Sequence, residues 1–187
     1  MKLNYNVLKV GDIVCCTSLK PLAIGIRTRE AGVLNAFHTN ICTHVGIIVP
    51  VGYGDTYMLA IAEMLGDGLK INSLSDYMNK GYFGDRIVDI KRFEPFDDPD
   101  IMEAILKQIM IWWQEGKKYD YAGALKYVLP FLKDKVGQFY CSELLAWLAL
   151  NITRKSLVED RPKDDNIHPW AIQTSKLLTS VAGFQTK

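Results

Sequence analysis

The chain lacks the features that would send it out of the cell or into a membrane. Its start, MKLNYNVLKVGD, reaches Asn4, Asn6 and Lys9 before any apolar run long enough for a secretory signal peptide. No later stretch holds the roughly 18 to 20 uninterrupted apolar residues that a membrane helix needs. We therefore expect a cytoplasmic protein without an integral membrane segment, and a phage or viral setting fits the same features.

Cysteine and histidine are scarce and are not spaced as metal ligands. The 4 cysteines contain no CxxC pair, and the adjacent Cys15 and Cys16 would point to opposite faces of a strand. The 3 histidines, His38, His44 and His168, are well separated in the chain. The sequence therefore predicts reduced thiols and no metal site.

An excess of one charge is also missing. The formal net charge is +1 and there is no long basic block, which excludes a general electrostatic reason to expect a nucleic-acid partner. Internal repeats, low-complexity tracts and long linkers are absent as well. A hydrophobic content of 49% over 187 residues is enough for a sizeable core, so we predict a single domain over residues 1–187.

Strand patterns fill the first half of the chain and helix patterns the second. Strands are predicted at 12–16, 44–51, 57–64 and 86–93, with a hairpin turn at GYGD, 52–55. Helices are predicted at 99–115, after a cap at Asp97 or Asp98, and at 119–129, 141–150 and 168–178. This segregation favours an α+β fold over a doubly wound parallel sheet.

Cys141, in the segment FYCSELLAW, has two interpretations. The apolar residues after it predict a helix that starts within residues 139–142, where free N–H groups would favour a thiolate and bind a developing oxyanion. The same composition is typical of a buried core cysteine, which the segment alone favours. Because the charge of Glu143 opposes a thiolate, a nucleophile here would need a histidine partner.

His44 differs from the other histidines because it opens a predicted strand. Strand alternation puts His44, Gly46 and Ile48 on one face, and the glycine would leave room beside the imidazole for a helix start or a substrate. A half-exposed histidine at a strand end fits the same spacing. Both interpretations stay open on this pattern.

Glu63 ends an otherwise apolar face on the next predicted strand, after Tyr57, Leu59 and Ile61. A carboxylate in that position needs a partner, and an imidazolium would supply one. The alternative, which the pattern slightly favours, is a glutamate that reaches solvent at the strand end.

These segments together resemble a known enzyme family, the YiiX-like branch of the circularly permuted NlpC-type, papain-like cysteine amidases. The resemblance rests on GDIV (11–14), THVGIIV (43–49), AIAEM (60–64), GKKYDY (116–121) and FYCSELL (139–145), in this order. HPWAI (168–172) resembles the Pro-containing tail segment of the family. The histidine precedes the cysteine in the chain, the reverse of ordinary papain-like enzymes, which is what permutation implies.

The resemblance implies a cysteine helix packed against a small antiparallel sheet that carries the histidine and the polar residue. It makes Cys141 the nucleophile, His44 the general base and Glu63 the residue that orients the histidine, with Tyr140 lining the oxyanion site. The implied activity is a cysteine hydrolase, an amidase or peptidase, that forms a thioester acyl-enzyme on a small peptide, amide or lipid acyl substrate. Neither a metal nor an organic cofactor is required.

Two alternatives remain beside this interpretation. A lipid-directed thiol acyltransferase or phospholipase would use the same residues, with the apolar stretch 19–34 as a hydrophobic lid, although an amphipathic core helix explains that stretch better. A non-catalytic ligand-binding module on the same fold is the other alternative, and the presence of all three of Cys141, His44 and Glu63 argues against it.

Overall fold

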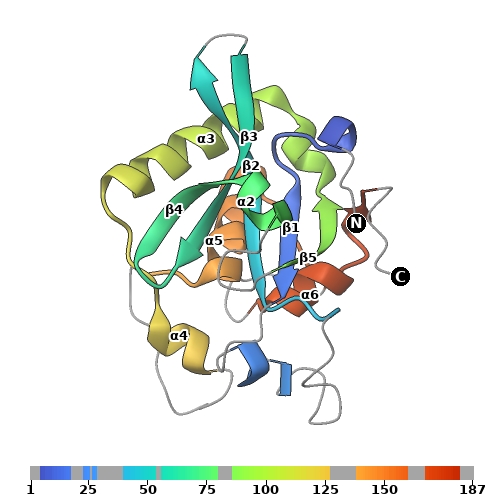
Figure 1. Cartoon of the computed structure of the whole chain (residues 1–187), viewed down its shortest axis with the longest axis vertical. Helices are drawn as coiled ribbons and strands as arrows, with labels where there is room; N and C mark the ends of the chain where they lie inside the picture. Colours follow the sequence, from blue (N-terminus) through green and yellow to red (C-terminus); the bar gives the residue numbers. More distant parts are fainter. Residues whose placement is uncertain are drawn as a thin grey trace.

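One antiparallel sheet organises the molecule. The computed structural model describes residues 5–17, 23–25, 27–28, 40–53, 56–79, 86–126, 138–159 and 167–181. Within these residues the sheet has six strands in the order β4-β3-β2-β1-β5-β6 (Figure 1). The strands are β1 (Ile13–Thr17), β2 (His44–Tyr53), β3 (Thr56–Leu65), β4 (Gly68–Ser73), β5 (Arg86–Arg92) and β6 (Thr179–Ser180). Together with the helices below they make an α+β fold, as predicted.

Four of the strands, β1, β2, β3 and β5, occupy the predicted positions within two residues at each end. β2 and β3 form a long hairpin whose register runs from Gly46 opposite Glu63 to Tyr53 opposite Thr56. Of the turn predicted at 52–55, residues 54–55 lie outside the described residues. The prediction missed β4 and β6, because β4 is short and follows β3 after a tight turn, and β6 consists of two exposed residues.

Strand alternation divides the core into two layers. The residues that β1, β2 and β3 turn to one side, such as Ile13, Ile47 and Ala62, pack with two helices, α3 (Pro99–Gln114) and α5 (Cys141–Leu148). The opposite side carries Ile48 and Ile61 and is covered by the short helix α2 (Leu74–Asn79). In Figure 1, α2 accordingly lies in front of the strands and α5 behind them. Each fully buried Ile or Leu side chain contributes about 1.5–3 kcal/mol to this packing.

The helix predictions hold best where the chain supplies both a cap and an apolar stripe. Asp98 caps α3, and its carboxylate accepts hydrogen bonds from the N–H groups of Asp100 at 2.9 Å and Ile101 at 3.4 Å. α3 buries Ile105, Ile109 and Trp112, which recur at helical spacing along one side of the helix. The remaining short helical elements are η1 (Tyr5–Val7), η4 (Glu94–Asp97), α4 (Tyr121–Lys126), η5 (Ala149–Thr153) and α6 (Pro169–Thr174).

The other three helix predictions have the wrong ends. α4 begins at Tyr121 rather than 119, because the carboxylate of Asp120 accepts the N–H of Gly123 at 2.9 Å, and residues 127–129 of that prediction lie outside the described residues. α5 begins at Cys141, as predicted, but η5 prolongs it to Thr153 as a π-helical turn. The helix predicted over 168–178 ends at Thr174, since Ser175 is extended (φ −60°, ψ 133°).

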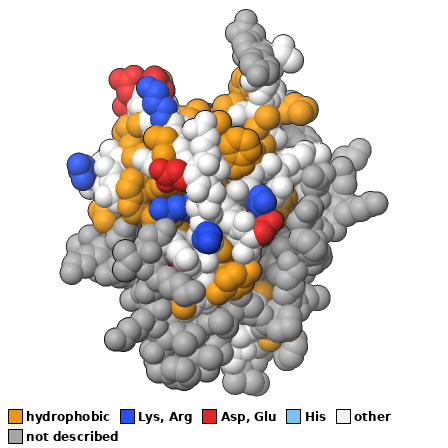
Figure 2. Space-filling model, turned by 90° about the vertical axis from the view of Figure 1, so that its left-hand side faces the viewer, with side chains coloured by type: hydrophobic (Ala, Val, Ile, Leu, Met, Phe, Trp, Pro, Cys, Tyr) orange, Lys and Arg blue, Asp and Glu red, His pale blue; other side chains and the backbone are white. Residues whose placement is uncertain are grey.

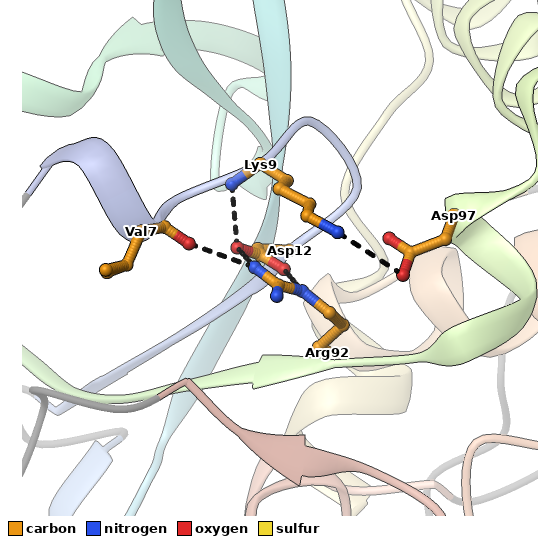
Figure 3. Close-up of polar contacts among 5 residues, drawn as sticks. All are labelled: Val7, Lys9, Asp12, Arg92 and Asp97. Carbon is orange, nitrogen blue, oxygen red and sulfur yellow. Dashed lines mark hydrogen bonds and ion pairs between the residues drawn. The ribbon is translucent and has the colours of Figure 1, made fainter.

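A buried ion pair joins the start of β1 to the end of β5. Asp12, with an exposed fraction of 1%, accepts two hydrogen bonds of 2.8 Å from Arg92 and one of 2.9 Å from the N–H of Lys9 (Figure 3). The guanidinium of Arg92 also donates to the carbonyl of Val7 at 3.1 Å, and its hydrogen bonds to Asp12 raise the pKa of Arg92. The Asp of the GDIV segment therefore has a structural role.

The exposed hydrophobic side chains of the outer surface are scattered among charged ones. Figure 2 shows the side of the molecule that carries the end of α3 and β4, where hydrophobic side chains are interspersed with charged ones. On α3 the side chains of Met110, Ile111 and Trp113 are exposed. Scattered exposed hydrophobic residues are normal on a protein surface, so we assign no partner to this face. Within the described residues, no helix is both long enough and apolar enough to span a membrane.

We expect the substitution Asp12→Asn to lower the free energy of unfolding by about 2–4 kcal/mol, because an amide N–H₂ would then face the partly buried guanidinium of Arg92. Urea denaturation followed by circular dichroism measures the change. Lys9→Ala is the matched control: its ammonium lies 3.6 Å from Asp97 with both side chains exposed, and its loss should cost less than about 1 kcal/mol. Equal effects of the two substitutions would contradict the assignment.

Candidate functional site

Cys141 is the first residue of α5 and has an exposed fraction of 4%. The preceding residue, Tyr140, is extended (φ −94°, ψ 174°), and its N–H donates to Glu143 Oε2 at 3.3 Å, as in a capping box. The hydroxyl of Ser142 donates to the carbonyl of Ile167 at 2.6 Å, which fixes the first turn of the helix against the segment before α6. The helix therefore begins at the cysteine, as predicted, and the carboxylate of Glu143 is engaged with the backbone.

His44 is the first residue of β2, and two neighbouring elements fix the backbone around it. Cys16 of β1 lies opposite His44, and its carbonyl accepts the N–H of Thr43 at 2.8 Å. The side chain of Gln173, on α6, accepts the N–H of Cys42 at 2.8 Å. It also donates to the backbone carbonyl of Asn40 at 2.9 Å. The imidazole thus projects from a backbone that is held on both sides.

Glu63 of β3 lies beside His44 and is fully buried, with an exposed fraction of 0%. Its Oε2 lies 2.6 Å from His44 Nε2. Its Oε1 accepts a hydrogen bond of 2.8 Å from Asn72 Nδ2, and the hydroxyl of Tyr77 lies 2.5 Å from both oxygens. The alternative in which this glutamate reaches solvent is therefore wrong, because β4 and α2 cover the end of the face on which it lies.

The imidazole of His44 also contacts Cys141. The first residue of α5 lies close enough to the first residue of β2 for the charge and hydrogen bonding of Cys141 to be among the causes that raise the pKa of His44. Since Nε2 is engaged with Glu63, Nδ1 is the ring nitrogen left for the thiol. The structure thus places Cys141, His44 and Glu63 in one continuous chain of side-chain contacts.

The surroundings favour the charged forms of both His44 and Glu63. Burial lowers the pKa of His44, but Cys141 and Glu63 raise it more, through charge and hydrogen bonding, so the pKa lies well above its ordinary value of 6.5. Burial raises the pKa of Glu63, but hydrogen bonds from His44, Tyr77 and Asn72 and the charge of His44 lower it more, to below its ordinary value. Both shifts therefore favour an imidazolium bonded to a carboxylate.

Gly46 is needed at its position for a different reason from the one expected. A Cβ atom there would lie 2.5 Å from Ile61 Cγ2 and 3.1 Å from Glu63 Cβ, across the β2–β3 pair. The absence of a side chain at Gly46 thus makes room for Ile61 and Glu63 of β3, rather than for a helix start or a substrate. The shared face of His44, Gly46 and Ile48 is as predicted, since Ile48 and Ile61 lie in the same core layer.

The other residues considered from the sequence lie elsewhere or have backbone roles. Tyr140 is buried at the N-cap of α5, directly before the cysteine, with an exposed fraction of 2%. His168 caps α6, and its Nδ1 accepts the N–H of Ala171 at 3.1 Å. His38 and most of the stretch 19–34 lie outside the described residues.

The sequence analysis missed three side chains that hold this site: Asn72, Tyr77 and Gln173. Glu63 itself is the one signal that could have led to the first two, because a buried carboxylate requires several donors. The donors lie on elements that the pattern did not predict, so no spacing rule connects them to Glu63. No pattern in the sequence indicated that Gln173 would hold the backbone beside His44.

The described side chains do not gather into a metal site. Among the residues that the structure places, no group of three or more His, Cys, Asp or Glu side chains is arranged to hold a metal ion. All four thiols are free and buried. Cys42 donates to the carbonyl of His44 at 3.1 Å, and burial, followed by the neighbouring Cys15 and Cys16, raises its pKa well above the ordinary value.

Comparison with known proteins identifies the fold. No family model matches the chain, and no curated protein matches it either. Among solved structures the chain is similar to one described as the metalloprotein yiiX from Escherichia coli O157:H7, with a TM-score of 0.65 at 17% sequence identity. The match covers 95% of this chain and 98% of the other. The chain therefore has a YiiX-like fold, and a likeness at this level of identity shows the fold alone.

The opposite pKa shifts of His44 and Glu63 predict a pH window of stabilisation. The contribution of His44 is fully present below pH 6.5 and is lost as the pH rises through its raised pKa in the folded protein; that of Glu63 is present above pH 4.5 and is lost as the pH falls through its lowered pKa. The stability advantage of the wild type over Glu63→Gln should thus be largest between about pH 4.5 and 6.5. Urea denaturation between pH 3 and 9 measures it, and a pH-independent difference would contradict the ion pair.

Proposed function

We propose that the chain is a cysteine hydrolase of the circularly permuted NlpC-type, papain-like group, with residues 1–187 as one catalytic domain and an amide or ester bond as its target. One observation carries this proposal: the contact chain Cys141–His44–Glu63, in which the cysteine begins a helix and a buried carboxylate holds the histidine. The order of histidine and cysteine along the chain and the antiparallel sheet beside the cysteine helix support the permuted arrangement.

In this mechanism Cys141 is the nucleophile and His44 the proton carrier. The thiol proton passes first to His44 Nδ1, which produces the imidazolium that Glu63 stabilises. The sulfur then attacks the substrate carbonyl carbon, and Nδ1 gives the proton to the leaving amine or alcohol as the carbon–nitrogen or carbon–oxygen bond breaks. The product is a thioester on Cys141. His44 then takes a proton from water, the resulting hydroxide attacks the thioester, and the acid leaves as the thiol is restored. Glu63 keeps Nε2 occupied throughout, so Nδ1 remains the working nitrogen.

The start of α5 supplies the site for the developing negative charge. The first N–H groups of a helix have no carbonyl partner within the helix, and they lie on its positive end. Cys141 is the first residue of α5, next to these groups in the chain, and we assign Tyr140, the buried residue before it, to the lining of this oxyanion site. Each well-aligned donor contributes on the order of 3 kcal/mol to the transition state.

The mechanism contains no metal-dependent step. The yiiX structure is described as that of a metalloprotein, but the ligand-type side chains described for this chain do not cluster in threes. The pair that His44 Nε2 forms with Glu63 also leaves only Nδ1 of this imidazole for any other partner, and the mechanism uses Nδ1 for the thiol proton.

We expect iodoacetamide to alkylate Cys141 at pH 6 at least tenfold faster in the wild type than in His44→Ala, because the histidine stabilises the reactive thiolate. Mass spectrometry of the digested protein identifies the modified residue, and Cys42, which is fully buried, should remain unmodified. His168→Asn is the matched control, since it removes another histidine and retains an N-cap residue at α6. A rate that does not respond to His44 would contradict the proposed role of the pair.

A second measurement on the same protein identifies the class of acyl donor. Incubation with panels of peptide amides and of phospholipids, followed by intact-mass analysis, should show an acyl mass that is absent in Cys141→Ser. An adduct from peptide amides supports an amidase or peptidase. An adduct from phospholipids supports the lipid-directed acyltransferase or phospholipase, and neither adduct nor turnover would support a binding module in place of the enzyme.

A further inference from the structure

Glu63 accepts hydrogen bonds from three side chains of three different elements. His44 comes from β2, Asn72 from β4 and Tyr77 from α2. The bonds are distributed over both oxygens: Oε1 receives Asn72, Oε2 receives His44, and the hydroxyl of Tyr77 lies 2.5 Å from each. The carboxylate therefore has a partner on every side in a place without exposed surface.

This distribution fixes the orientation of the carboxylate. A carboxyl group held at one oxygen can rotate about its terminal torsion, which has a broad energy minimum. With donors on both oxygens, rotation would break at least two hydrogen bonds without water to replace them. One oxygen is consequently kept on His44 Nε2, and Nδ1 is the ring nitrogen left for Cys141.

We propose that Asn72 and Tyr77 are positioning residues of this site, which hold Glu63 in the orientation and the ionised form that direct His44 toward Cys141; this inference rests on the proposed function. The segment from β4 to α2, residues 68–79, thus supports the site through its hydrogen bonds to Glu63. Its two donors act through Glu63, and Glu63 acts through His44.

The surrounding charges agree with this role. The groups that face the cluster are Cys141 from α5, Cys16 from β1, opposite His44, and Lys70 from β4, opposite Glu63. Lys70 is partly exposed and pairs with Asp67 at 3.0 Å, so the nearest cation on β4 is directed to another carboxylate. The hydrogen bonds from Tyr77 and Asn72 are among the causes that lower the pKa of Glu63.

The test is the pH profile of Cys141 alkylation in Tyr77→Phe, which removes one hydroxyl and keeps the ring that packs beneath β3. Loss of this donor makes Glu63 easier to protonate, and a protonated Glu63 no longer supports the imidazolium of His44. The acid limb of the profile, where the alkylation rate rises with pH, should therefore shift to higher pH by about one unit. At a fixed pH on that limb the reaction should be about tenfold slower. Asn72→Ala should move the limb in the same direction.

Two control variants separate positioning from general destabilisation. Tyr57→Phe removes an exposed hydroxyl at the far end of β3, and Ile105→Val removes a buried methylene from α3, in the core layer away from Tyr77. Neither should move the acid limb, and Ile105→Val should nevertheless lower the urea midpoint. A shift of the limb in Ile105→Val equal to that in Tyr77→Phe would overturn the inference.

The outcomes also separate this inference from the proposed function. If the wild-type profile depends on His44 and Tyr77→Phe leaves it unchanged while lowering the urea midpoint, Tyr77 serves stability alone and the positioning role is wrong. If the wild-type profile does not depend on His44 at all, the proposed function itself fails. A shifted limb in Tyr77→Phe, with His44 dependence retained, supports both.

Discussion

The buried charge of Glu63 is the constraint around which this end of the molecule is arranged. An ionised carboxylate without exposed surface is costly unless several donors compensate for the lost water. Here the compensation comes from three elements that are separate in the sequence, so the sheet, β4 and α2 must all be in place before the charge is tolerated. The cost of burial ensures that the imidazole has one favourable orientation.

The rest of the fold brings the cysteine to this imidazole. α5 packs in the core layer on one side of the sheet, while Glu63 and Tyr77 belong to the other side, and the two sides meet where β2 begins. α6 holds the backbone before β2 through Gln173, and the hydroxyl of Ser142 fixes the first turn of α5 to the chain before α6. The distant ion pair of Asp12 and Arg92 keeps β1 and β5 together at the opposite end of β1 (Figure 3).

The sequence could predict those features that repeat with the period of an element. Alternation located β1, β2, β3 and β5, and the Asp98 cap with its apolar stripe located α3. The same alternation put His44 on one face of its strand with Gly46 and Ile48, and Glu63 on one face of the next strand with Leu59 and Ile61. β4, α2 and the donors Asn72 and Tyr77 could not be predicted, since they depend on how the chain returns over β3 after the turn at 66–67. The resemblance to permuted papain-like enzymes correctly indicated a YiiX-like fold, whereas its catalytic implications remain proposals.

The central claim is that Glu63 and Cys141 act on His44 from opposite sides of its ring. The most direct measurement is an NMR titration of the ¹⁵N-labelled imidazole of His44 in the wild type, in Glu63→Gln and in Cys141→Ser. The account predicts a wild-type midpoint above the ordinary pKa of 6.5, and a lower midpoint in each variant. A wild-type midpoint at or below 6.5, or a midpoint that Cys141→Ser leaves unchanged, would contradict it.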